Sequence, residues 1–277
     1  MPAGWSRPKL LYKYTCARNL ESIVGSTLAF PGYLELNDPF ESSIECAIEQ
    51  LRLDFQSPPN KPEPIRINPS LRIIEPSTHN ASERRLYNAD AATYNKRLDE
   101  AFQYLEFCRD HLGILSLTAD PRNVVMWAHY AQGGEGVCIG IDFNDDSITK
   151  YRPASWREAG HDTLFQVVQV NYRRDRPSYA DLSAMGYVEK AFFTKFEPWS
   201  YEQEYRVLRP LGECKLNVKG VPLHQLPPKL IKEIILGIKA KPETVKLASE
   251  LCSTFTHLRL MKTELVPKQY GLVPRPM

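Results

Sequence analysis

The block of residues 113–142 constrains the fold most, because it joins two apolar segments through a short helix and a glycine-rich turn. The segment GILSLTAD (113–120) is apolar and β-prone, which predicts a buried strand. The segment NVVMWAHYA (123–131) predicts a short helix with Asn123 at its N-cap. The segment GGEGVCIGID (133–142) predicts a turn that runs into a second strand. These elements form the best-defined core of the chain.

Strands and helices alternate irregularly around this block. Further strands are predicted at 9–15, 27–32, 163–172, 204–210, 231–237 and 258–266. Further helices are predicted at 19–25, 81–111, 182–196 and 242–255. This mixed order predicts an α+β fold with a mixed, largely antiparallel central sheet or sheets and flanking helices.

The length of 277 residues fits one domain with a long insertion. We therefore expect a single α+β domain over 1–277, interrupted by an insertion at 48–111. The stretch 57–80 within it is rich in proline and polar residues, which predicts a loop. The stretch 81–111 returns to helical spacing, so the insertion is predicted to be partly helical.

Composition narrows the possible partners. The hydrophobic fraction of 43% and charged fraction of 25% are ordinary for globular proteins, and the net charge of +2 does not indicate a nucleic-acid or membrane surface. No apolar run approaches roughly 18 residues, and the first residues lack a signal-peptide pattern. The six cysteines and six histidines are dispersed. We expect a cytoplasmic protein with reduced thiols, no metal site and no membrane partner.

The stretch SYEQEYRVLRP raises a question about two carboxylates. On a strand, Glu202 and Glu204 would share one face, where they repel each other and one pKa can rise. One interpretation is an exposed strand edge with ion pairs to Arg206, Lys195 or Arg209. The other is a cleft in which Trp199, Tyr201 and Tyr205 form an apolar wall for a flat ligand.

The stretch MWAHYAQGGEG carries a second set of candidates. Trp127 and Tyr130 are three residues apart and share a helix face, whereas His129 points elsewhere. The pair fits core packing. It also fits a cleft that exposes Tyr130 and His129, next to glycines that allow close backbone approach.

Two further short stretches carry candidates. LNDPFES (36–42) contains Asn37, Asp38, Phe40 and Glu41, and fits either a capped turn or a binding loop. In YKYT, Lys13 faces away from its neighbouring tyrosines. It is either a surface lysine or an inward cation that needs a carboxylate or a ligand phosphate.

These stretches together resemble a known family. The chain is similar to a bacterial family known as domain of unknown function 2971 in four groups of short segments. In chain order these are LYKYT, NLESIV and TLAF; LNDPFES; LSLT, MWAHYA and GVCIGID; and YEQEYRV. The resemblance covers roughly residues 10–240, and the insertion departs from it. The layout also resembles, more distantly, ADP-ribosyltransferase-like folds, which implies NAD as cofactor.

The second resemblance implies roles for individual residues. Lys13, Tyr14 or Thr15 would hold NAD where such folds have a histidine or arginine, and Ser116, Thr118 or Tyr130 would support the ribose. Glu204, with Glu202 as its partner, would stabilise the oxocarbenium-like transition state, and Tyr130 belongs with them as a catalytic candidate. The remaining cofactor-binding and cleft candidates are Trp127, His129, Arg206, Asn37, Asp38, Phe40, Glu41, Trp199 and Tyr201.

The expected function is therefore that of an ADP-ribosyltransferase-like enzyme, acting by transfer or NAD glycohydrolysis on an intracellular protein or nucleic acid in bacterial defence or toxin action. An alternative is a non-catalytic module that binds a nucleotide, peptide or nucleic acid through the same cleft. Local positive charge for it would come from Arg173, Arg174, Arg206 and Arg209. A third alternative is a metal-dependent nuclease using Asp38, Glu41, Glu202 and Glu204.

Overall fold

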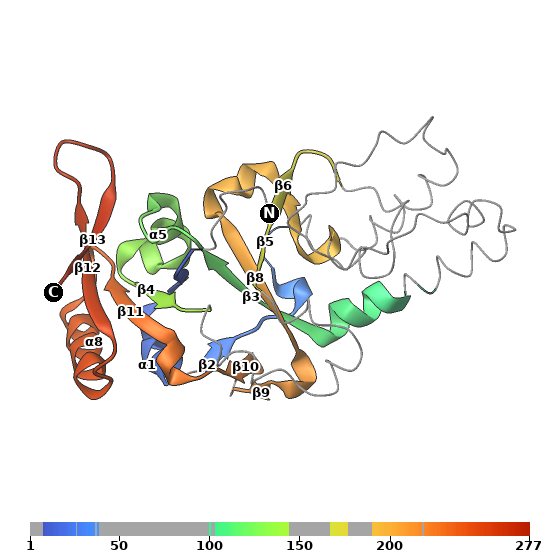
Figure 1. The fold of residues 1–277 in the computed structure, drawn as a ribbon, viewed down its shortest axis with the longest axis horizontal. Coiled ribbons are helices and arrows are strands. Elements are labelled where there is room, and N and C mark those ends of the chain that lie inside the picture. Colours follow the sequence, from blue (N-terminus) through green and yellow to red (C-terminus); the bar gives the residue numbers. More distant parts are fainter. Residues whose placement is uncertain are drawn as a thin grey trace, which may run out of the picture.

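The computed structural model describes residues 8–25, 27–36, 38, 100, 103–143, 167–176, 190–217 and 219–277. Its main feature is an eight-stranded sheet with the order β13-β12-β11-β4-β1-β3-β8-β5 (Figure 1). The strands are β1 (Leu11–Thr15), β3 (Leu112–Thr118), β4 (Val137–Ile141), β5 (Val168–Gln169), β8 (Glu204–Pro210), β11 (Ile231–Leu236), β12 (Arg259–Leu265) and β13 (Leu272–Pro276). Neighbours run antiparallel except for the parallel pair β11 and β12.

Two smaller sheets accompany the main one. The strands β2 (Thr27–Ala29), β10 (Pro222–Gln225) and β9 (Lys215–Leu216) pair antiparallel. The strands β6 (Asn171–Arg173) and β7 (Thr194–Phe196) pair in parallel. The second of these sheets matters for function, because β7 carries Lys195 towards the main sheet.

Helices cover both faces of the main sheet. The longest named helix, α8 (Pro242–Thr254), is the crossover between the parallel strands β11 and β12, with proline in its first turn (Figure 1). It lies with the short helix α1 (Leu20–Val24) on one face. The helix α5 (Val124–Tyr130) packs on the other face.

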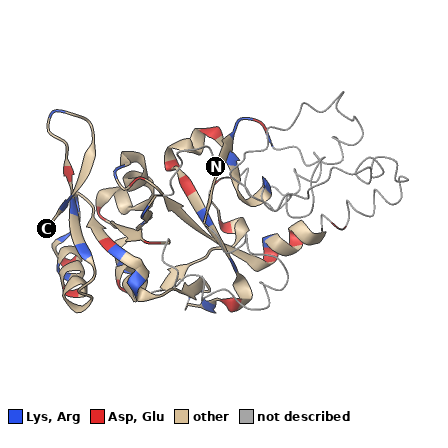
Figure 2. Ribbon diagram, viewed as in Figure 1, with Lys and Arg blue, Asp and Glu red and all other residues tan. Residues whose placement is uncertain are grey.

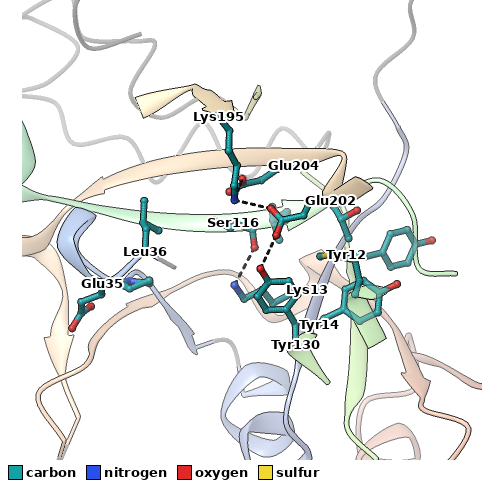
Figure 3. A pocket seen from close by; sticks show the side chains of 14 residues that line it. Tyr12, Lys13, Tyr14, Glu35, Leu36, Ser116, Tyr130, Lys195, Glu202 and Glu204 are labelled. Carbon is teal, nitrogen blue, oxygen red and sulfur yellow. Dashed lines mark hydrogen bonds and ion pairs between the residues drawn. The ribbon is translucent and has the colours of Figure 1, made fainter. Parts of the chain in front are cut away.

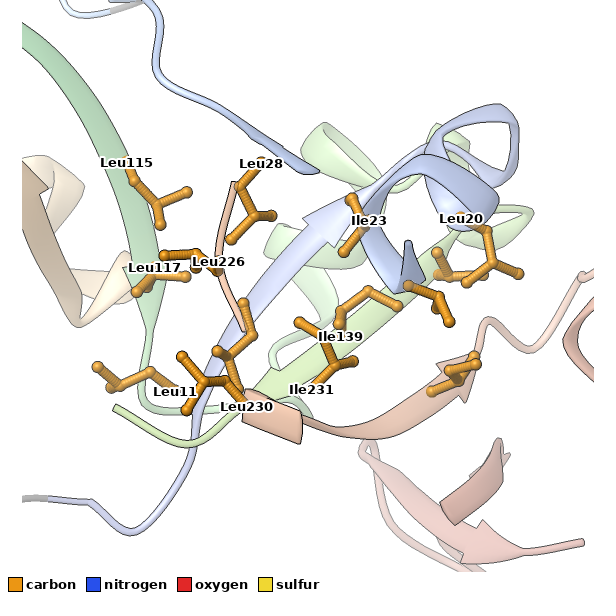
Figure 4. Packing of buried hydrophobic residues seen from close by; sticks show 14 of the residues in the cluster. Leu11, Leu20, Ile23, Leu28, Leu115, Leu117, Ile139, Leu226, Leu230 and Ile231 are labelled. Carbon is orange, nitrogen blue, oxygen red and sulfur yellow. The ribbon is translucent and has the colours of Figure 1, made fainter. Parts of the chain in front are cut away.

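Two apolar clusters reflect this arrangement. The larger one joins α1 and α8 to the sheet and includes Leu11, Ile23, Leu117, Ile139 and Ile231 (Figure 4). The smaller one joins α5 to the opposite face, where Trp127 meets Tyr14 edge-on at 5.1 Å between ring centroids. The sheet is therefore buried on both sides near its centre, which explains the apolar runs in β4 and β11.

The main sheet opens between β1 and β3. Strand β1 is in register with β4 from Leu11 to Thr15, but with β3 at the single pair Tyr12 and Thr118. Strand β3, in turn, is in register with β8 along its whole length. The two halves of the sheet thus diverge beyond Tyr12, and Lys13 bridges the opening by donating a hydrogen bond from Nζ to the Ser116 carbonyl at 3.0 Å.

The predicted fold class is confirmed at the level of a mixed α and β structure with a large, mostly antiparallel sheet. The ADP-ribosyltransferase-like form and the single domain stay predictions. The predicted strands at 9–15, 113–120, 204–210, 231–237 and 258–266 and the helices at 123–131 and 242–255 are found within a few residues of their expected bounds. Residues 103–111 are helical as predicted, while residues 48–99 and 101–102 of the insertion lie outside the described residues.

Three predictions are wrong in detail. Residues 194–196, expected at the end of a helix, form β7, because their backbone pairs with β6. The described part of the strand predicted at 163–172 is split into β5 and β6, which join different sheets. Glu202 does not lie on a strand, because it ends the 3₁₀ helix η6 (Glu197–Glu202) that precedes β8.

Candidate functional site

A pocket of about 140 Å³ lies where β1 and β3 separate (Figure 3). Its lining comes from β1, β3, α5, β7, the junction of η6 with β8, and η2 (Tyr33–Glu35). The polar side chains that line it include Lys13, Ser116, Tyr130, Lys195, Glu202 and Glu204. The opening in the sheet therefore gathers charged groups from distant parts of the sequence.

The two glutamates converge through a turn. Gln203, between them, has a left-handed backbone with φ 44°, which ends η6 and starts β8. Glu202 Oε2 and Glu204 Oε2 accept hydrogen bonds from the same ammonium, Lys195 Nζ, at 2.7 and 3.1 Å. Both glutamates are buried. The predicted pairing of these carboxylates is present, but it arises from a 3₁₀ helix followed by a strand.

Glu204 is held by several donors. Arg206 lies two residues along the same strand face and donates from Nε to Oε1 at 2.8 Å and from Nη2 to Oε2 at 3.0 Å. Figure 2 shows these opposite charges side by side on β8. Burial alone raises the pKa of Glu204, but Arg206, Lys195 and Ser116 outweigh burial and lower this pKa to about 2. Glu204 is therefore an ionised anchor with both oxygens engaged.

Glu202 is engaged differently. Its Oε1 accepts a hydrogen bond from the Tyr130 hydroxyl at 2.6 Å, and its Oε2 accepts the bond from Lys195. An ionised carboxylate offers about four acceptor positions. Glu202 thus keeps acceptor capacity at the pocket, where Figure 3 shows its carboxylate facing Tyr130 and Lys195.

The helix α5 sets the position of Tyr130. Asn123 caps this helix, because its Oδ1 accepts from the backbone N–H of Val125 at 2.9 Å and of Met126 at 3.2 Å. The Asn123 Nδ2 also donates to the Tyr201 carbonyl at 2.6 Å. One side chain thus starts α5 and ties it to η6, the two elements that supply Tyr130 and Glu202.

Lys13 brings a second ammonium group to the pocket. Burial lowers the pKa of Lys13 below its usual value, although Glu204 and Glu202 oppose this change. Its hydrogen bond to the Ser116 carbonyl uses one of its hydrogens. Of the two interpretations open for Lys13, the inward-facing one therefore fits the structure.

The structure brings seven of the predicted residues together as pocket lining: Lys13, Tyr14, Ser116, Thr118, Tyr130, Glu202 and Glu204. Others serve elsewhere. Trp127 is core packing in the cluster under α5, and Thr15 accepts a hydrogen bond from Asn19. Arg206 is wholly buried and donates to Glu204 and to the Phe192 carbonyl. Trp127 therefore acts through packing and Arg206 by holding Glu204, whereas the Thr15 hydroxyl contacts Asn19 at the start of α1.

The predicted aromatic wall of Trp199, Tyr201 and Tyr205 does not line the pocket, and Tyr205 packs in the larger apolar cluster instead. The Tyr201 hydroxyl and His129 Nδ1 are 3.4 Å apart at the surface, and the Trp199 ring lies 5.0 Å from Lys195 Nζ. Trp199 therefore faces the charged cluster through Lys195. Asp38 is buried, whereas Asn37, Phe40 and Glu41 lie outside the described residues.

Sequence reasoning missed Lys195 as a site residue and treated it as one ion-pair partner of an exposed edge. The side chain is buried and forms the centre of the carboxylate pair. Its signal is the stretch AFFTKFEPW, in which one lysine stands among aromatic residues. Such a lysine must find carboxylates or water when its neighbours are buried.

The described part of the chain contains neither a cluster of metal-binding side chains nor a helix suited to cross a membrane. Within it, no group of three or more histidine, cysteine, aspartate or glutamate side chains could hold a metal ion. The ligand set of the metal-dependent nuclease includes Glu41, which lies outside these ranges. Among the helices that the structure describes, none is long and apolar enough to cross a membrane.

One comparison with known proteins gives a match. The model of the family described as protein of unknown function (DUF2971) matches residues 126–207, which confirms the family resemblance over that segment. The matched segment contains Tyr130, Lys195, Glu202 and Glu204, whereas Lys13 and Ser116 precede it. No curated protein and no solved structure matches this chain.

Proposed function

Proceeding from a chain whose residues 126–207 match DUF2971, we propose that the pocket between β1 and β3 binds NAD and that the protein is ADP-ribosyltransferase-like. It breaks the bond between nicotinamide and ribose and passes the ADP-ribosyl group to an intracellular target or to water. The observation that carries the proposal is the pair of buried glutamates joined by Lys195 at this pocket. A setting in bacterial defence or toxin action rests on analogy with such folds.

Glu202 is the carboxylate best placed for the chemistry. When the glycosidic bond breaks, its electron pair leaves with nicotinamide and positive charge develops on the ribose. A fixed carboxylate in an enclosed pocket stabilises that charge. Glu202 retains acceptor capacity for this task, while Glu204 is engaged by Arg206, Lys195 and Ser116. Glu204 then contributes by holding Lys195, and through Lys195 it holds Glu202.

The other lining groups suit a nucleotide. Lys13 can donate to a ribose or phosphate oxygen, and the hydroxyls of Ser116 and Tyr130 can pair with ribose hydroxyls. Tyr12 and Tyr14 add aromatic lining from β1. These groups match a ligand that carries hydroxyls and a flat ring.

One observation favours a second candidate, the non-catalytic binding module. Lys195 and Arg206 already form ion pairs with the two carboxylates of Glu202 and Glu204. Such a set can hold a binding surface in shape without taking part in a reaction. A module of this kind would bind NAD or a related nucleotide and release no nicotinamide.

The test follows nicotinamide release by chromatography from NAD incubated with the purified full chain, alone and with cell lysate. The variants are Glu202→Gln, Glu204→Gln and the control Glu197→Gln, which changes an exposed glutamate at the start of the same 3₁₀ helix. Glu202→Gln should lower the rate by about 10²-fold or more, the usual effect of removing one electrostatic stabiliser, and Glu197→Gln should not. Thermal stabilisation by NAD without product supports the binding module instead.

A further inference from the structure

Lys13 is placed for more than contact with a phosphate or hydroxyl oxygen. Its Nζ reaches the pocket through the gap between β1 and β3, and the Ser116 carbonyl orients it at 3.0 Å. Figure 3 shows the Lys13 amine and the Tyr130 hydroxyl both pointing into the pocket that Glu202 also lines. A neutral lysine that donates one N–H to a carbonyl keeps its lone pair for an electrophile.

From this geometry we propose that Lys13 captures the aldehyde carbon of a small hydroxylated ligand, such as an open-chain sugar, as a Schiff base. The inference does not depend on NAD cleavage, because any aldehyde of this class would serve. It gives Lys13 a covalent role in addition to the hydrogen bonds and ion pairs that an ammonium group can form.

The step balances within the pocket. The Nζ lone pair forms a bond to the carbonyl carbon, and the carbonyl electron pair moves to oxygen, which gives a carbinolamine. Over the two steps the nitrogen loses both of its hydrogens, and these become the hydrogens of the departing water: one reaches the oxygen when the carbinolamine forms, and the other reaches the hydroxyl as it leaves. Tyr130 can relay the second proton, giving its own proton to the hydroxyl and taking one from the nitrogen, when its O–H turns from Glu202 Oε1, to which it donates at 2.6 Å.

The charges around Lys13 are consistent with this role. Burial lowers the pKa of Lys13, which raises the neutral fraction that can attack a carbonyl. The groups at the same pocket are Glu35 from η2, Tyr12 and Tyr14 from β1, Tyr130 from α5, Lys195 from β7, Glu202 from η6 and Glu204 from β8. Because Lys195 is held between the two carboxylates, they are shared and do not hold Lys13 as a simple ion pair.

The test is reductive trapping. The full chain is incubated with glyceraldehyde or ribose 5-phosphate and cyanoborohydride, and each modified lysine is located by peptide mass mapping. Imine formation loses water and reduction adds two hydrogens, so a trapped lysine gains the mass of the aldehyde less one oxygen. The reference within the same molecule is Lys246 on α8, whose side chain is 78% exposed.

We expect Lys13 to be modified severalfold faster than Lys246, despite its enclosure. Tyr130→Phe keeps the amine but removes the proton donor, and should slow trapping at Lys13 by about a hundredfold, the lower end of acid–base contributions, without changing Lys246. Lys13→Arg should abolish the fast modification. Equal or slower modification of Lys13 in the wild-type chain, or no effect of Tyr130→Phe, would overturn the proposal. Neither outcome depends on whether NAD is cleaved.

Discussion

Lys195 Nζ lies 2.7 Å from Glu202 Oε2, and the side chains are only 3% and 5% exposed. Removing one partner of a buried pair leaves an uncompensated charge, which usually costs about 3–5 kcal/mol. We therefore expect Lys195→Met to lower the free energy of unfolding by about that amount, because two carboxylates lose a shared cation. Urea unfolding measures the change, with Lys246→Met as the exposed control. A loss no larger than that of the control would contradict the role given to Lys195.

Glu204 should make the free energy of unfolding depend on pH in the acid range. Its pKa of about 2 in the folded protein lies below the ordinary glutamate value of 4.5. The stabilisation is therefore complete above pH 4.5 and is lost as the pH falls towards 2. Urea unfolding between these pH values should show a steep decline for the wild type and a flatter one for Glu204→Gln. The exposed change Glu250→Gln should keep the wild-type slope, and parallel curves for all three would count against a native-state pKa this low.

Asn123 couples the start of α5 to η6, so its loss should affect both stability and the site. Asn123→Ala removes the N-cap and the bond to the Tyr201 carbonyl. We expect a loss of about 1–2 kcal/mol, the upper half of the usual range for caps, together with weaker function at the pocket. Val124→Ala, at the exposed first position of the same helix, is the control for both thermal unfolding and NAD turnover. Equal behaviour of the two variants would argue against the coupling.

Gly136 lets the chain after α5 pass close to β1. A Cβ at this position would lie 2.3 Å from the Thr15 carbonyl oxygen and 3.0 Å from the Ala131 backbone. Gly136→Ala should therefore lower the free energy of unfolding by about 1–3 kcal/mol, as overpacking usually does. Gly212→Ala, where a Cβ meets nothing within 4 Å, should leave stability nearly unchanged. Matching denaturation midpoints for the two variants would show that the close approach is not required.

Local patterns predicted the elements that depend on local chemistry. The apolar run of β3, the Asn123 cap of α5 and the first-turn proline of α8 all stand at or near their predicted positions. The strand β7 was not predicted, because its three residues continue a helical pattern. They form a strand only through pairing with β6. Such tertiary pairing overrides local preference and leaves no local signal.

The contacts of the site were likewise predictable only where the residues are close in sequence. The pairing of Glu202 and Glu204 was predictable because the residues are close in sequence, although the left-handed Gln203 between them was not. The contact of Tyr130 with Glu202 joins positions 72 residues apart, and that of Lys13 with Ser116 joins positions 103 apart. No spacing rule gives contacts of this kind. They follow from the divergence of β1 and β3, which only the assembled sheet defines.

The action of Glu202 on NAD is tested by the initial rate of nicotinamide release, measured for wild type and Glu202→Gln at the same protein concentration. We expect release by the wild-type chain, alone or with lysate, and its loss in Glu202→Gln, while Glu197→Gln retains the wild-type rate. Equal release by wild type and Glu202→Gln, or no release by a folded wild-type chain under either condition, would show that Glu202 does not act on NAD.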